Sequence, residues 1–385
     1  MRHLPRLTLA TTWLVLACAL VACSKDKDVE PPAALVAIDA RLSVQRLWEV
    51  SLGGKDRALR LALAPAVDGG RLYAAGADGY VHALDAASGR SLWRTKTKLA
   101  LSAGPAVGQG IVVAGASDGQ VVALDAATGA KRWQVRVTGE VLATPVITAQ
   151  AVVIRTVDGR IRALAPDTGR ERWSNEQTVP RLSLRGTSSP VLAGDTVICG
   201  FDNGKVAAYA IATGDTLWET AVSPPRGKTE LERLVDIDGR IEVSGHDVFV
   251  AGFQGRIAML ALDSGQIWWS RDLSSDRGVV LDGETLYVTT ADSSVQALRR
   301  RDGTPLWQQD RLVRRGLTAP TVDGDAIVVA DFQGFVHWLD RASGALVGRI
   351  GTHKGRVTNA PVVANGIVYL QTDAGRVYAL RARAR

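Results

Sequence analysis

Residues 72–93 read LYAAGADGYVHALDAASGRSLW, and residues 112–133 read VVAGASDGQVVALDAATGAKRW. Both stretches contain an apolar run, an Asp-Gly pair, a second run of the form Val-x-Ala-Leu, an Asp-x-x-Ser/Thr-Gly turn and a final tryptophan. Trp93 and Trp133, which end the two copies, lie 40 positions apart. A fixed period of this size indicates a chain built from structural repeats.

Each repeat has the pattern of a small antiparallel sheet. Asp-Gly between two β-rich runs is a strong hairpin signal, and we expect type I′ turns there, with positive φ at both central residues. A further short run precedes each copy and is often opened by proline, for example Pro65 and Pro105. Four antiparallel strands in about 40 residues are typical of one blade of a β-propeller.

Six later copies bring the number of blades to eight. Their hairpin turns are Asp158-Gly159, Asn203-Gly204, Gln254-Gly255, Ser293-Ser294, Gln333-Gly334 and Ala374-Gly375. Closing tryptophans recur as Trp173, Trp218, Trp269 and Trp307, whereas the seventh copy has Val347. The sequence therefore predicts an all-β fold, an eight-bladed β-propeller with four antiparallel strands per blade.

The last repeat has no closing strand after residues 378–380, but a stretch upstream of the first repeat has the required form. Residues 44–51 read VQRLWEVS, with Trp48 in the place of the closing tryptophan. We expect this N-terminal strand to complete the eighth blade and close the ring. Such closure removes the free sheet edges that promote aggregation.

The N-terminus has the features of a bacterial lipoprotein precursor. Residues 1–22 combine positive charge with an apolar run that is shorter than a membrane-spanning helix needs, which is typical of a signal peptide. Cys23 follows Leu-Val-Ala, as in a lipobox, and is expected to carry the lipid anchor. We therefore predict a signal peptide over 1–22, a lipidated cysteine with a flexible tether over 23–40, and one propeller over 41–385.

Composition and motifs offer little support for catalysis or nucleic-acid binding. The formal net charge is +7, and the basic residues are spread along the chain without a clustered basic face, except at the end, where Arg381, Arg383 and Arg385 alternate with apolar residues. The histidines fall in different repeats without ligand spacing, and nucleophile-elbow, phosphate-loop and zinc-helix motifs are missing. Cys199 lies in a strand pattern and is expected to be a small buried residue. We predict no catalytic residues, no metal site and no cofactor.

The segment of residues 85–93, DAASGRSLW, resembles the tryptophan docking motif of quinoprotein propellers. That resemblance implies enzymes that hold pyrroloquinoline quinone on the propeller axis beneath an adjacent cysteine pair. This chain has no adjacent cysteines. Because the motif is present but the cysteine pair is not, a quinone-dependent dehydrogenase is kept only as the alternative function.

Lipobox, eight repeats and an N-terminal closing strand together resemble the BamB family, the propeller lipoproteins of the outer-membrane β-barrel assembly machine. The repeat is enlarged on both sides of its fourth unit, where residues 180–190 and 228–238 are similar to two loops of that family. The resemblance implies that these loops bind the periplasmic domain of BamA. The matching positions are Leu182, Leu184, Arg185, Asp236 and Asp238, with Arg233 in the same segment.

The residue pattern agrees with a binding patch at these loops. Leu182 and Leu184 alternate with Ser183, so both project the same way if the loop is extended. Arg185 and the two aspartates would then provide polar contacts around an apolar centre. The alternative is internal: the leucines fill the blade core and Arg185 pairs with Asp236 or Asp238 to staple the loops together.

The expected function is that of a non-catalytic scaffold at the periplasmic side of the outer membrane, which assists folding and insertion of outer-membrane proteins. BamA is the implied partner, and contact with nascent outer-membrane proteins stays open. A propeller lipoprotein that binds another periplasmic partner remains a third alternative.

Overall fold

The structure, a computed structural model, describes residues 30–53, 61–184, 186, 188–352 and 355–385. The chain divides into two compact units, Met1–Pro32 and Ala33–Arg385. The predicted signal peptide and the predicted lipidation site Cys23 lie outside the described residues. In the described ranges no helix is long and apolar enough to span a bilayer.

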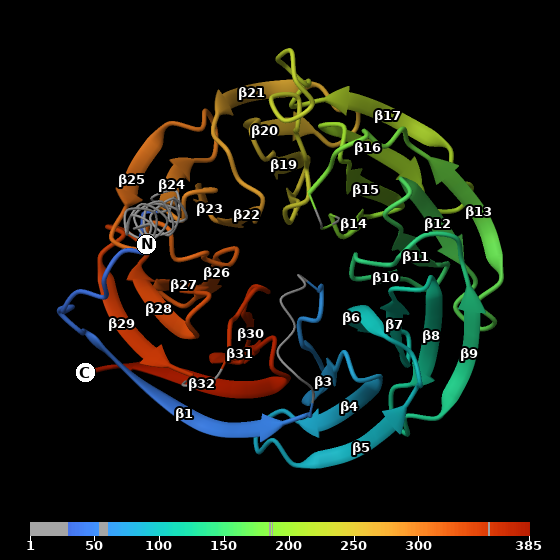
Figure 1. Cartoon of the computed structure of the whole chain (residues 1–385), viewed down its shortest axis with the longest axis horizontal. Coiled ribbons are helices and arrows are strands. Elements are labelled where there is room, and N and C mark those ends of the chain that lie inside the picture. The colour runs from blue at the N-terminus through green and yellow to red at the C-terminus, as the bar shows by residue number, and fades with distance from the viewer. Residues whose placement is uncertain (1–29, 54–60, 185, 187, 353–354) are drawn as a thin grey trace, which may run out of the picture. The chain divides into compact units, whose positions relative to one another are not determined.

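The second unit is a ring of eight four-stranded antiparallel sheets, which confirms the eight-bladed propeller (Figure 1). Blade one consists of β2 (Ala66–Asp68), β3 (Arg71–Ala75), β4 (Tyr80–Asp85) and β5 (Ser91–Lys96), and blade two of β6 (Leu101–Gly108), β7 (Ile111–Ala116), β8 (Gln120–Asp125) and β9 (Lys131–Arg136). Blade three consists of β10 (Val146–Ile147), β11 (Val152–Arg155), β12 (Arg160–Leu164) and β13 (Glu171–Glu176), and blade four of β14 (Val191–Ala193), β15 (Thr196–Gly200), β16 (Lys205–Ala210) and β17 (Thr216–Ala221).

The remaining blades follow the same order from the axis outward. Blade five consists of β18 (Glu242–Ser244), β19 (Asp247–Ala251), β20 (Arg256–Ala261) and β21 (Ile267–Asp272), and blade six of β22 (Val279–Asp282), β23 (Thr285–Thr289), β24 (Val295–Arg299) and β25 (Pro305–Gln309). Blade seven consists of β26 (Thr321–Asp323), β27 (Ala326–Ala330), β28 (Phe335–Asp340) and β29 (Leu346–Gly351), and blade eight of β30 (Val362–Ala364), β31 (Ile367–Gln371), β32 (Arg376–Ala384) and β1 (Leu42–Ser51).

The N-terminal strand closes the ring as expected. β1 pairs antiparallel with β32 from Leu42↔Ala384 to Ser51↔Arg376, so the first and last strands lie side by side (Figure 1). Trp48 on β1 connects blade eight to blade one, because its indole N–H donates to the Ala86 carbonyl at 3.0 Å.

The closing tryptophans pack one blade against the next. The Trp93 indole donates to the Ala126 carbonyl at 3.1 Å and lies over Gly129, whose φ is 74°. A Cβ at Gly129 would lie 2.6 Å from the Trp93 ring, so only glycine fits. The Asp-x-x-Ser/Thr-Gly turn of a blade thus binds the closing tryptophan of the blade before it.

The hairpin turns differ from the expected type I′. At Asp78-Gly79 the glycine has φ 88°, but Asp78 is not among the residues with positive φ. The Gly79 N–H donates to the Gly76 carbonyl and the Gly76 N–H to the Tyr80 carbonyl. This is a three-residue loop, a type I turn followed by a left-handed glycine, so the predicted turn type was wrong although the hairpin was right.

Candidate functional site

Two enlarged connections flank blade four on one face of the ring. Residues 177–190 join β13 to β14, and residues 222–241 join β17 to β18. Both run from the outermost strand of one blade to the innermost strand of the next. The isolated bridges Ala62↔Ala103 and Arg240↔Gly278, which join the innermost segments of neighbouring blades, are parallel, so these segments run in the same direction. Every such connection therefore lies on the same face, which we call the loop face.

The structure describes five of the six predicted residues, and these five lie at three different depths. Leu182 is 42% exposed and Arg233 is exposed, whereas Leu184 is half-buried. Asp236 is fully buried and Asp238 is nearly so, at 0% and 7% exposure. Arg185 lies outside the described residues.

The two aspartates therefore do not form exposed polar contacts around an apolar centre. Their role in the fold is internal: the Leu184 backbone N–H donates to Asp236 Oδ2 at 3.2 Å, which connects the first loop to the second. The Asp236 carbonyl accepts the Phe253 N–H at 2.7 Å, which fixes the second loop to blade five. Ser188 adds a second connection, since its hydroxyl donates to the Gly239 carbonyl at 3.3 Å. The two loops consequently form one surface.

Below this surface lies a buried charge cluster that the sequence did not reveal. Carboxylate oxygens of Asp202, Asp236 and Asp238 lie within 4.8 Å of one another. The fully buried Arg155, at the end of β11, donates from Nη2 to Asp202 Oδ1. Its guanidinium also lies 4.9 Å from the Phe201 ring centre. Arg155 supplies the positive charge that a metal ion would otherwise bring to three carboxylates.

This environment changes the protonation of Asp236. Burial, reinforced by the neighbouring carboxylates of Asp238 and Asp202, raises the pKa of Asp236 to about 10 from an ordinary value of 3.8. Arg155 acts in the opposite direction without cancelling the shift. Asp236 is therefore protonated at neutral pH, and its Oδ2 still accepts the Leu184 N–H.

A pH-dependent stability follows from the raised pKa. Below the unfolded pKa of 3.8 both states hold the proton; above it the unfolded chain releases the proton while the folded chain keeps it, so this group's stabilisation is lost as pH rises toward 10. We expect Asp236→Asn, which retains a carbonyl acceptor, to become steadily more stable than wild type between about pH 5 and 9. Urea midpoints measured in parallel across that range test this. Parallel curves for the two proteins would contradict the assignment.

The second loop also carries an exposed apolar side chain that sequence reasoning missed. Leu231 is 65% exposed, more than any other large hydrophobic residue described. The turn that bears it is locally fixed, since Glu232 accepts the Lys228 N–H at 2.7 Å and the Thr229 N–H at 3.1 Å. The Thr-x-x-Glu spacing of Thr229 and Glu232 is a capping box, and this signal was present in the sequence.

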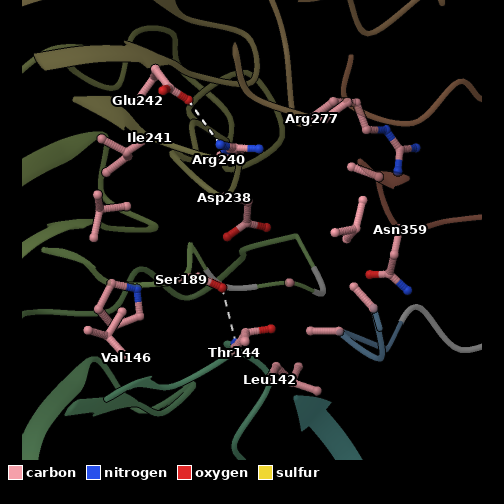
Figure 2. A pocket seen from close by; sticks show the side chains of 18 of the residues that line it. Leu142, Thr144, Val146, Ser189, Asp238, Arg240, Ile241, Glu242, Arg277 and Asn359 are labelled. Atoms are coloured by element: carbon pink, nitrogen blue, oxygen red, sulfur yellow. Dashed lines mark hydrogen bonds and ion pairs between the residues drawn. The ribbon is translucent and has the colours of Figure 1, made fainter. Parts of the chain in front are cut away.

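Beside the loops is a cavity of about 520 Å³, lined by residues in or next to the innermost strands of several blades (Figure 2). Ser189 and Asp238 from the two loops border it, and Ser189 Oγ accepts the Thr144 N–H at 3.0 Å. Arg240 also lines it and pairs with Glu242 at 3.2 Å. The walls are largely aliphatic, with Leu142, Val146 and Ile241 among them. Among the described residues that line it, no nucleophile is paired with a base.

Fold and site together define an eight-bladed propeller of the quinoprotein-like class, with two joined loops on one face. The family model described as outer membrane protein assembly factor BamB matches residues 32–100, 77–309 and 291–384. The chain belongs to the BamB family.

Individual relatives agree with this membership. "Outer membrane protein assembly factor BamB" of Pseudomonas aeruginosa is 44% identical over 371 residues, 96% of this chain and 98% of that protein. The crystal structure of BamB from Moraxella catarrhalis superposes with a TM-score of 0.80 at 29% identity, and the match covers 88% of this chain and 100% of that one.

Quinone enzymes are more distant. Quinohemoprotein alcohol dehydrogenase from Comamonas testosteroni has a TM-score of 0.69 at 14% identity, covering 88% of this chain and 76% of that one, which shows a shared fold alone. Because the family's members are named as assembly factors, the chain is classed as non-catalytic.

Proposed function

We propose that this chain is a scaffold of outer-membrane protein assembly that binds the periplasmic domain of BamA through its two joined loops. The observation that carries the proposal is the link between Leu184 and Asp236, because it holds the exposed parts of both loops in one fixed surface. A surface fixed in advance loses little conformational entropy on binding.

Within this proposal the residues have different tasks. Leu182 and Leu231 offer exposed apolar contacts, and Arg233, close to Leu231 in sequence, offers an exposed charge. Leu184 is half-buried and connects the surface to its support. Asp236 and Asp238 act as positioning residues from below. Arg185 is proposed as a partner contact by its match to the family motif alone.

The proposal includes an address and an anchor. Residues 1–22 are removed as a signal peptide, Cys23 is acylated, and the protein is held at the outer membrane with its propeller in the periplasm. Several acyl chains on one cysteine supply the firm anchoring that a single chain does not. Nascent outer-membrane proteins are further candidates for contact, through strand addition at a blade edge.

Affinity capture from envelope extracts tests the proposal. We expect the mature wild-type propeller to retain BamA, and Leu184→Asp combined with Arg185→Ala to lose it, because a charge enters the loop surface while a proposed contact is removed. Circular dichroism and urea unfolding of the variant provide the folding control. Recovery of a different periplasmic protein, with BamA missing from both samples, would favour the alternative of another partner.

A further inference from the structure

The segment before β1 is bound to the propeller, although its sequence suggested a flexible tether. Residues 33–41, which we call the strap, precede the first strand and follow the outer surface between blades six and seven. At its start the Ala33 N–H donates to the Val313 carbonyl at 3.1 Å. At its end Arg41 pairs with Asp340 at 3.3 Å. Ile38, between these points, packs against the core of the two blades.

A buried polar chain holds the strap. Arg315, 2% exposed, donates from Nη1 to the Ala33 carbonyl at 2.9 Å and from Nε to Asp331 at 2.7 Å. Asp331 also accepts from His337 at 3.1 Å, and Arg349 connects His337 to the Val36 carbonyl at 3.3 and 3.0 Å.

The hydrogen-bond directions in this chain are consistent with a neutral histidine. Arg349 Nε donates to His337 Nδ1, so the ring proton is on Nε2 and points to Asp331. Burial lowers the pKa of His337, which favours the same neutral form. A buried guanidinium is costly unless its donors are satisfied, and the Ala33 carbonyl satisfies one of them. The strap is therefore part of the folded unit.

The strap changes the face from which the N-terminal chain leaves the propeller. Arg41 lies by Asp340, at the turn between β28 and β29, on the face opposite the loop face. Ala33 lies by Val313 and Arg315, in the connection from β25 to β26, which belongs to the loop face. Without the strap the chain would depart from the opposite face, at the start of β1.

Chain length limits how far the anchor can lie from this exit. Ala33 follows Cys23 by ten positions in the sequence. Fully extended, this stretch reaches at most about 35 Å, roughly half of what the chain from Cys23 to Leu42 would allow. The exit is bordered by the exposed Arg311 and Arg314, whose charge suits the anionic headgroups of phosphatidylglycerol.

We propose that the strap acts as a mount for the lipid anchor. Because the strap makes the N-terminal chain leave the propeller on the loop face, the part of that face at blades six and seven is held toward the lipid surface. The inference rests on the proposed lipidation of Cys23. The partner-binding loops and the lipid surface then lie on the same side of the propeller. The loops flank blade four, whereas the chain leaves at blades six and seven, so the two contacts use different parts of the ring.

Quenching by a spin-labelled bilayer tests the mount on the full lipidated protein. A fluorophore is attached at Ala291→Cys, which is exposed at the turn between β23 and β24 on the loop face, or at Asp325→Cys, whose side chain is 99% exposed at the turn between β26 and β27 on the opposite face. Cys199 is buried and will not compete for the label. In vesicles of phosphatidylethanolamine and phosphatidylglycerol with nitroxide headgroups, we expect at least about twofold stronger quenching at position 291.

Two variants separate the possible failures. Cys23→Ser should abolish flotation with the vesicles; if wild type floats no better than Cys23→Ser, the lipid anchor itself is wrong and the mount falls with it. If wild type floats but both labels are quenched equally, or position 325 more strongly, the mount alone is overturned. A Gly-Ser insertion of about twelve residues between Pro32 and Ala33 leaves the strap intact and should reduce the difference between the labels. An unchanged difference would also contradict the mount.

Discussion

Arg155→Met is expected to lower the free energy of unfolding by about 3–5 kcal/mol, the range for removing one partner of a buried ion pair. Arg155 is 1% exposed and supplies the cation among Asp202, Asp236 and Asp238. Its removal leaves carboxylates buried close together without that charge, and burial of an uncompensated charge is among the most destabilising changes known in proteins. The urea midpoint, followed by tryptophan fluorescence, measures the loss.

A double variant serves as the matched control. Replacing Arg155 by Met together with Asp202 by Leu removes both partners of the pair, so we expect it to recover part of the lost stability. Because the cluster supports the linked loops, Arg155→Met should also weaken partner binding under conditions where it is still folded. A single variant as stable as wild type would show that Arg155 is not the balancing charge.

Trp48→Ala is expected to cost about 3 kcal/mol, at the lower end for a tryptophan truncated in a packed position. Trp48 docks over Gly89 and donates to Ala86, so it joins the eighth blade to the first and completes the ring. A weakened closure exposes the edge of β32, and we expect aggregation at lower temperature than for wild type.

Trp268→Ala is the control for this prediction. Trp268 is next to a closing tryptophan on β21, but 57% of its surface is exposed. Its truncation should change the free energy of unfolding by less than about 0.5 kcal/mol, as is usual for surface substitutions. If both alanine variants lose stability equally, ring closure does not depend on the Trp48 contact.

The sequence predicted the architecture because each blade repeats the same local signals. Asp-Gly pairs, Val-x-Ala-Leu runs and closing tryptophans act within one unit or between neighbouring units, so their period reveals the fold. The ring closure was also predictable, since residues 44–51 supply the strand pattern that the last repeat lacks. The turn type was not, because a glycine after aspartate fits both a type I′ turn and a type I turn with a left-handed glycine.

The sequence could not predict how deeply the candidate site residues are buried. Leu182 and Asp236 looked alike as loop residues, yet one is 42% exposed and the other is fully buried. Burial of Asp236 depends on Arg155 and Asp202, which come from other blades and carry no local signal in the sequence. The strap was missed for the same reason: Arg315 and Arg349 are distant in sequence from the segment they hold.

Titration of purified propeller with the purified periplasmic domains of BamA tests the central claim most directly. Leu182→Asp places a charge on the loop surface, whereas Leu217→Asp places the same charge on the outer strand β17, at a leucine that is 52% exposed. We predict that wild type and Leu217→Asp bind equally and that Leu182→Asp binds at least about tenfold more weakly, a loss of about 1.4 kcal/mol. Equal binding by all three proteins, or none by wild type, would contradict the account.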